Sequence, residues 1–403
     1  MRRVLLALFA IAFLLRLLAG LMRGPDFVDE GYSFYATLAR TWLAGGGFCY
    51  DPFVDCTIRM PLYPLLVAPF LAADAAFPWL IVLQSLVDAA LVWIAYAMAT
   101  ELFNARAGVV AAVATAFNPY AITHASSFQE TVIFNALIAV AIYLLITASR
   151  AGNPRHYAAA GTLLALATLT TVRMAFLLPV AVIWAAMSGP DATLPTRARR
   201  AALVGVPIVL LLGGWALRNQ QLIGAPVLST ESGLSLWIAN NPLTMSVLPN
   251  QSIDLVEDRA RGLLAEEHQR AIASLESDPV AQDQYYARLG WRYIATQPAA
   301  ALSGGVKKAW FGWVGWLSPA RDWPIQLAYA LVFLPLNVLA LVGLWRARRL
   351  GGPHTLVRLL VVTFLITTAV FWAHTSHRSF LHLFEIIYAA SVLTKVRTGA
   401  YGA

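Results

Sequence analysis

Long apolar segments recur through this chain and limit its fold more than any other feature does. Segments of membrane-spanning length, about 20 residues each, follow one another with short polar gaps between them. A soluble domain carries charge on about a quarter of its residues, whereas 12% of these 403 residues are charged and the mean hydropathy is +0.65. The sequence therefore predicts an all-α polytopic integral membrane protein.

The apolar segments predict about ten transmembrane helices, within a range of about nine to twelve. Several of them lie at the short end of the length that crosses a bilayer. The predicted spans are 4–22, 79–103, 107–123, 130–149, 157–172, 174–188, 202–217, 325–345, 357–373 and 379–394. The first is expected to be a retained anchor, because Arg16 interrupts it and no small-residue cleavage site follows.

Basic residues predict the orientation of these spans. With the N-terminus in the cytoplasm, fourteen Lys and Arg residues fall in cytoplasmic segments, against the acids Asp191 and Glu101. We expect both termini in the cytoplasm of a bacterium, the protein in its inner membrane, and segment 303–317 along the outer surface as an interfacial helix. The net charge of +8 follows from this orientation and gives no reason to expect a nucleic-acid partner.

Three regions are predicted along the chain. Residues 1–217 form an N-terminal transmembrane module with an extracytoplasmic loop at 24–78, residues 218–324 a second extracytoplasmic loop, and residues 325–403 C-terminal transmembrane helices. Helical surface segments are expected at 30–43, 62–73, 252–275 and 281–296. Cys49 and Cys56 share the first loop, where an oxidising compartment favours a disulfide and two free thiols are the alternative.

Two adjacent carboxylates, Asp29 and Glu30, follow the first span. Acidic residues are costly near hydrocarbon, so a pair at its edge indicates chemistry or ion binding. Neighbouring helical residues point about 100° apart and need not share one task. The alternative is that Asp29 caps a surface helix beginning at Glu30.

Arg59 ends the same loop, just before Pro61. Pro61 favours an extended chain before it and a helix after it, which predicts Arg59 at the membrane mouth near Asp29. A guanidinium there can bind a phosphate through two hydrogen bonds, and contact with lipid headgroups is the alternative.

Further charged and imidazole groups fall at the outer ends of other spans, where several arginines could converge on one anionic group. They are Glu130, Arg173, Arg218, His374, His377 and Arg378. A structural role is the alternative for each: a helix-dipole contact for Glu130 and an interface anchor for the arginines. His374 and His377 with one carboxylate could bind zinc, but no further Cys or His spacing supports it. No cofactor is expected to be required, and a divalent metal is an unsupported alternative.

These motifs together resemble the GT-C glycosyltransferases, in the branch that includes protein O-mannosyltransferases and the lipid A aminoarabinose transferase. The resemblance covers about residues 5 to 320. It rests on Asp29-Glu30-Gly31-Tyr32, on Arg59 to Pro64 with Tyr63, on Glu130, on Leu169 to Arg173, on Trp215 to Asn219 with Arg218, and on Trp237 to Pro242 with Asn240. Ala239 stands where the family often has glycine, and His377-Arg378-Ser379-Phe380 departs from its C-terminal motif.

The resemblance implies sugar transfer with inversion from a polyprenyl-phosphate-linked donor to a glycolipid, envelope-glycan or protein acceptor. It implies Asp29 as the general base and Arg59 as the first choice beside the donor phosphate, followed by Arg173, Arg218 and Arg378. Tyr32, Tyr63, Asn219, Asn240 and His377 join them as substrate-binding candidates, and Glu30 and Glu130 would orient arginines or acceptor groups. A transporter or flippase for a lipid-linked or small anionic solute is the main alternative, and an inactive scaffold protein is another.

Overall fold

Helices form every regular element in the part of the chain that the computed structural model describes, which is residues 1–29, 32–52, 55–73, 75–189, 193–372 and 374–395. The predicted all-α membrane architecture is confirmed. Among these residues, six helices are long and apolar enough to cross a membrane: α1 (Arg2–Leu21), α4 (Ala76–Leu102), α7 (Thr131–Ala151), α10 (Leu194–Ile223), α17 (Trp323–Arg346) and α18 (Pro353–Val370). Four more predicted spans coincide with shorter helices, namely α5 (Ala105–Ala116), α8 (Pro154–Thr170), α9 (Leu177–Met187) and α20 (His382–Leu393). The count of about ten spans therefore remains a prediction.

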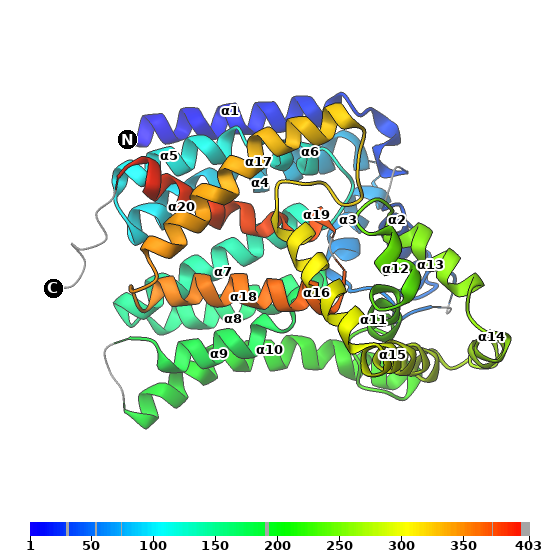
Figure 1. Ribbon diagram of the computed structural model, residues 1–403. Coiled ribbons are helices and arrows are strands. Elements are labelled where there is room, and N and C mark those ends of the chain that lie inside the picture. The colour runs from blue at the N-terminus through cyan, green and yellow to red at the C-terminus, as the bar shows by residue number, and fades with distance from the viewer. Residues whose placement is uncertain (30–31, 53–54, 74, 190–192, 373, 396–403) are drawn as a thin grey trace.

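The long helices form two layers (Figure 1). In the first layer, α1, α5 and α20 pack against α4, and α17 packs on α20. In the second layer, α8 lies between α7 and α10, and α9 packs on α10 and α18. Contacts of α7 with α4 join the layers, and α18 also packs on α7 within the second layer. Because α20 packs against α4 and α5, the last helices complete a bundle that the first helices begin. The three predicted regions, with boundaries after residues 217 and 324, remain a prediction.

Shorter helices gather at one end of this bundle (Figure 1). They are α2 (Phe34–Leu43), α3 (Leu62–Ala72), α11 (Ser232–Ala239), α12 (Pro242–Val247), α13 (Ile253–Gly262), α14 (Glu266–Ala273), α15 (Pro279–Thr296), α16 (Pro298–Trp313) and α19 (Thr375–Arg378). The expected segment 252–275 is thus two helices, and the segment expected at 303–317 begins and ends earlier. α16 packs along α18 and buries Lys308, so one of its faces belongs to the protein interior.

The predicted span 107–123 is broken in the structure. α5 ends at Ala116, and α6 (Pro119–Ala125) begins after Asn118, whose Oδ1 accepts hydrogen bonds from the amides of Tyr120 (3.0 Å) and Ala121 (3.3 Å). Pro119 brings no amide hydrogen, which suits the first position of a helix. The prediction of one continuous span was wrong here, because Asn118-Pro119 starts a new helix.

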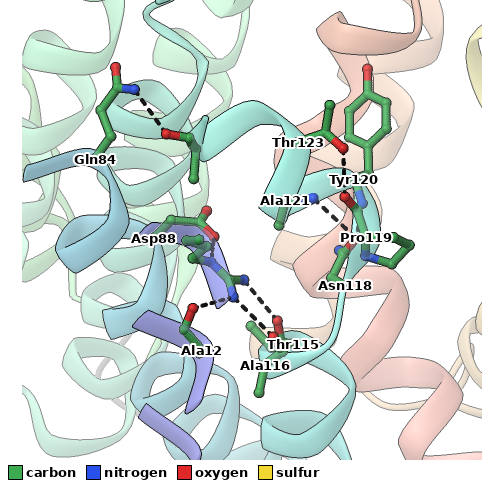
Figure 2. Close-up of polar contacts among 12 residues, drawn as sticks. Ala12, Gln84, Asp88, Thr115, Ala116, Asn118, Pro119, Tyr120, Ala121 and Thr123 are labelled. Atoms are coloured by element: carbon green, nitrogen blue, oxygen red, sulfur yellow. Dashed lines mark hydrogen bonds and ion pairs between the residues drawn. The ribbon is translucent and has the colours of Figure 1, made fainter. Parts of the chain in front are cut away.

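Arg16 makes this break stable inside the bundle. Its guanidinium donates to the carbonyls of Thr115 (3.1 Å) and Ala116 (2.9 Å), the last residues of α5, and its charge is paired with Asp88 of α4 (Figure 2). Backbone carbonyls at membrane depth need such partners. After the break, α6 packs against α1, α4 and α7.

Candidate active site

Glu130 and Arg173 form an ion pair at this end of the bundle. Glu130 directly precedes α7 and is 2% exposed, while Arg173 lies in the 3-10 turn η2 (Val172–Met174) that follows α8. Nη2 of Arg173 donates to Oε1 of Glu130. Oε2 of Glu130 is buried without a hydrogen bond, and Nε and Nη1 of Arg173 bond to none of the described residues. The pair therefore neutralises itself but keeps donor and acceptor capacity for a ligand.

Tyr35 of α2 interacts electrostatically with this pair and with Arg59. Its side chain is buried, and its ring packs on that of Tyr63 at 5.0 Å between centroids. Burial raises the pKa of Tyr35 well above its ordinary value, and the charge of Glu130 adds to this, whereas Arg59 and Arg173 act in the opposite direction. Tyr35 therefore keeps its hydroxyl proton and can donate it in a hydrogen bond. In the sequence, Tyr35 is one of several residues at helical spacing, and its place at this site was not predicted.

Arg59 pairs with Glu231, a residue that the sequence analysis did not consider. Its Nη1 lies 2.6 Å from Oε2 of Glu231, and its Nε donates to the hydroxyl of Tyr50 at 3.1 Å. The guanidinium also lies 4.6 Å from the centre of the Phe34 ring. Burial lowers the pKa of Arg59, but Glu231 and Tyr50 raise it by more, so the group stays charged. Nη2 has no partner among the described residues and can meet a phosphate oxygen.

Asp29 ends the 3-10 turn η1 (Pro25–Val28), and its side chain is exposed. Its carboxylate has no hydrogen bond or ion pair with any described residue, Arg59 included. Phe27 and Val28, just before Asp29, are buried in one cluster with Tyr35 and Tyr63. The backbone of Asp29 therefore lies next to this cluster. A capping role for a helix starting at Glu30 was wrong, because α2 begins at Phe34 with Ser33 as its N-cap. Glu30 itself lies outside the described residues.

Two tyrosines among the predicted site residues line the same cluster. The ring of Tyr32 contacts those of Phe34 and Tyr35, with centroids 5.5 Å and 6.3 Å away. Tyr63 is fully buried, and its hydroxyl donates to Oε1 of Gln84 at 2.8 Å. Tyr63 therefore belongs to the buried part of the cluster, whereas Tyr32 is partly exposed.

Arg218 and Asn219 bind peptide carbonyls. Arg218 donates to the carbonyls of Cys56 (2.6 Å) and Phe48 (3.4 Å), and Asn219 to that of Val227 (2.8 Å). The two Arg218 bonds hold both ends of the loop that the Cys49–Cys56 disulfide closes. The question left open between disulfide and free thiols is thus answered in favour of the disulfide.

Asn240 and Arg378 also donate hydrogen bonds to backbone carbonyls. Asn240 donates to the carbonyls of Leu236 and Val370 (both 2.8 Å), and fully buried Arg378 donates to the carbonyls of Trp313 and Val314. Of the four predicted arginines, Arg59 and Arg173 therefore approach one group, Tyr35, while Arg218 and Arg378 hold loops.

His374 and His377 lie next to each other, with ring centroids 5.4 Å apart. Burial lowers the pKa of His374 to about 4 and that of His377 well below its ordinary value, and Arg173 adds to both effects. Both rings are neutral at pH 7, and buried Nε2 of His374 has no hydrogen bond with any residue that the structure describes. Across the described residues, no third His, Cys, Asp or Glu joins them as a metal site, so the zinc hypothesis gains no support.

Comparisons with known proteins bear on the fold that carries this site. Residues 61–215 match the profile of the dolichyl-phosphate-mannose-protein mannosyltransferase family. The oligosaccharyltransferase of Archaeoglobus fulgidus in its apo form aligns at a TM-score of 0.55 and 13% identity, covering 97% of this chain and 50% of that one. The chain has a GT-C fold. The predicted resemblance to this superfamily is confirmed.

Two further solved structures are similar to this GT-C chain. The archaeal oligosaccharyltransferase AglB from Archaeoglobus fulgidus, in complex with an inhibitory peptide and a dolichol-phosphate, also aligns at a TM-score of 0.55, with 13% identity and the same coverage of 97% and 50%. ArnT from Cupriavidus metallidurans, bound to undecaprenyl phosphate, aligns at 0.40 with 14% identity, covering 97% of this chain and 77% of that one. This chain spans about half the length of the oligosaccharyltransferase structures. No curated protein matches the sequence.

The family match covers part of the candidate active site. It includes Tyr63, Glu130 and Arg173, but it begins two residues after Arg59 and ends before Arg218. Asp29 lies outside it as well. The ion pair of Glu130 and Arg173 therefore belongs to the matched segment, and the groups facing it come from the loops on either side.

Proposed function

We propose that this protein is a membrane glycosyltransferase that moves a sugar from a polyprenyl-phosphate-linked donor to an extracytoplasmic glycolipid, glycan or protein acceptor. The observation that carries the proposal is that two guanidinium groups at one end of the bundle, Arg59 held by Glu231 and Arg173 held by Glu130, both interact electrostatically with Tyr35. Asp29 lies at the same end and has no partner among the described residues. The matched mannosyltransferase family and the dolichol-phosphate bound by the oligosaccharyltransferase support the class of donor.

In the proposed reaction Asp29 takes the proton of an acceptor hydroxyl. The hydroxyl oxygen attacks the anomeric carbon of the donor sugar, and the bond from that carbon to the phosphate oxygen breaks. Its electron pair leaves with the polyprenyl phosphate, and the anomeric configuration inverts. Phosphate is a good leaving group, so the site needs positive charge beside it more than a general acid.

Arg59 and Arg173 supply that positive charge. Each is held by one carboxylate, Glu231 or Glu130, and each keeps guanidinium N–H groups that bond to no described residue. Fixed donors of this kind stabilise charge that develops on a leaving phosphate without reorganising during the reaction. Tyr35 and the neutral His374 are additional uncharged groups beside the same space.

The proposed orientation places the site outside the cytoplasm. α1 begins, and α20 ends, at the end of the bundle opposite to the short helices (Figure 1). Both ends of the described chain therefore lie on one side, as two cytoplasmic termini require. A bacterial inner membrane remains part of the proposal.

The test is a transfer assay on the purified protein in lipid nanodiscs with a panel of polyprenyl-phosphate sugars. Mass spectrometry of glycolipids and envelope glycans, with and without the protein, would guide the choice of acceptor. We expect a new glycosidic bond and release of polyprenyl phosphate. Movement of the lipid-linked sugar across the bilayer without bond formation would overturn the proposal in favour of a flippase.

A further inference from the structure

A groove of about 360 Å³ lies between α8 and α10, in the halves of these helices that are remote from the candidate active site. Its walls are Ala158, Arg199, Ala202, Leu203, Val206 and Pro207. Arg199 is the one charged residue in this wall. The other residues of the wall are apolar, so the groove suits an apolar occupant.

Small residues create the groove. The two helices touch closely at Gly161, where a Cβ would lie 2.2 Å from the carbonyl oxygen of Val204. Beside this contact, Ala158 and Ala202 are too short to fill the space between the helices. Val209 and Leu210, which follow the groove on α10, are 68% and 69% exposed. The groove therefore opens on the outer surface of an apolar helix of membrane-spanning length, where acyl chains are its surroundings.

Two arginines stand at the end of the groove nearer the helix starts. Arg155 lies three residues before Ala158 on α8, and Arg199 lies three residues before Ala202 on α10, so each is on the groove side of its helix. Both are exposed, and neither side chain has a partner among the described residues. Asp191 is the one acidic residue in the sequence between 131 and 230, and it lies outside the described residues. An anion is the complement of this charge.

We propose that the groove binds an anionic phospholipid of the bilayer, with one acyl chain along its apolar floor and the phosphate between Arg155 and Arg199. Guanidinium groups bind phosphate through paired hydrogen bonds, and basic pockets between transmembrane helices hold anionic headgroups. The site lies at the opposite end of the helices from Arg173 and Arg218, which separates it from the proposed donor site. The inference therefore does not depend on the proposed function.

Native mass spectrometry on the full chain tests this proposal. The purified protein is mixed with phosphatidylglycerol or phosphatidylethanolamine of the same chain length, and the lipid retained is counted. We expect preferential retention of phosphatidylglycerol, reduced about fivefold or more by Arg155→Glu or Arg199→Glu. Ala202→Trp, which fills the groove without changing the charge, should reduce it as well.

Arg197→Glu is the matched control. Arg197 is exposed and lies two residues before Arg199, on the other side of α10. Equal losses in Arg197→Glu and Arg199→Glu, or full retention in Ala202→Trp, would overturn the proposal and indicate nonspecific attraction to a basic surface. Equal retention of the two lipids by the unaltered protein would also overturn it. Circular dichroism on each variant checks that the helices are intact.

Discussion

Two arginine–carboxylate ion pairs of this bundle, Arg16–Asp88 and Arg173–Glu130, differ in their roles. Arg16 and Asp88 are nearly inaccessible, and all three nitrogens of the Arg16 guanidinium are bonded, to Asp88 and to the carbonyls of Ala12, Thr115 and Ala116. Arg173 is 19% exposed and uses one nitrogen on Glu130, which keeps one oxygen free.

The difference shows how a structural pair can be told from a functional one. Burying charge is costly unless its groups are bonded. The Arg16 guanidinium meets that condition, with all three nitrogens bonded, while it stabilises a broken helix. Among the described residues the Arg173 guanidinium bonds through one nitrogen, so it does not meet that condition without a ligand. Incomplete hydrogen bonding at an accessible end of the bundle therefore identifies the candidate active site better than the presence of buried charge does.

The largest expected effect is that of Asp29→Asn on sugar transfer. If Asp29 is the general base, the substitution should lower turnover by about 10²- to 10⁴-fold. Because the side chain is exposed and unpaired among the described residues, the melting temperature should not change. Near-normal turnover would remove Asp29 from the reaction, and Asp26→Asn, on the same turn, is the matched control.

Arg16→Met should cause the largest loss of stability. It leaves Asp88 buried without its partner and the last carbonyls of α5 without donors, at a cost of about 3 to 5 kcal/mol. Asp88→Asn should cost less, since the carbonyl bonds of Arg16 remain. Thermal denaturation in detergent measures both. A cost of Asp88→Asn equal to or above that of Arg16→Met would refute the capping role of Arg16.

Lys308 sharpens the comparison because an ammonium, unlike a guanidinium, can lose its charge. It is buried and donates to the carbonyls of Ala239 (3.1 Å) and Val370 (3.2 Å), and burial lowers its pKa to about 7. The unfolded chain keeps this proton up to a pH of about 10. Between these values the unfolded state binds more protons, so stability should rise with pH, by about 2 kcal/mol between pH 7 and pH 9.

The measurement for Lys308 is a series of denaturation curves from pH 6 to about pH 9. Lys308→Met removes the titrating group, so its curve should rise less with pH than that of the unaltered protein. Parallel curves for the two proteins would show that Lys308 does not titrate in this range.

Arg59→Gln should have the smallest effect of the set, about tenfold on turnover, because solvent screens the charge of this partly exposed arginine. The ion pair with Glu231 is about one-third exposed, so the loss of stability should stay below about 1 kcal/mol. Glu231→Gln keeps the guanidinium and should lower turnover by less. Turnover that falls more in Glu231→Gln than in Arg59→Gln would mean that the carboxylate, and not the arginine, serves the reaction.

Much of the fold could be predicted from the sequence. The apolar segments match helices because membrane burial gives a strong local signal, and Asn118-Pro119 was visible as a turn signal within the segment 107–123. The partner that makes this break stable was not visible, since Arg16 lies about a hundred residues away from it along the chain.

The site was predictable in parts. Glu130 and Arg173 could each be selected as costly charges at span ends, but their pairing across 43 residues could not. Glu231 was not considered because no local pattern links it to Arg59, 172 residues earlier. Tyr35 was missed because a tyrosine at helical spacing looks like a packing residue, and its charged neighbours come from three other segments.

The most direct test compares Arg173→Met with Arg16→Met, measuring turnover per folded molecule and melting temperature on the same samples. The account predicts that Arg173→Met loses at least about 10²-fold in turnover with a smaller loss of stability, while Arg16→Met mainly lowers the melting temperature and its folded fraction still transfers sugar. Full turnover in Arg173→Met, or loss of turnover in well-folded Arg16→Met, would contradict the assignment of the two pairs.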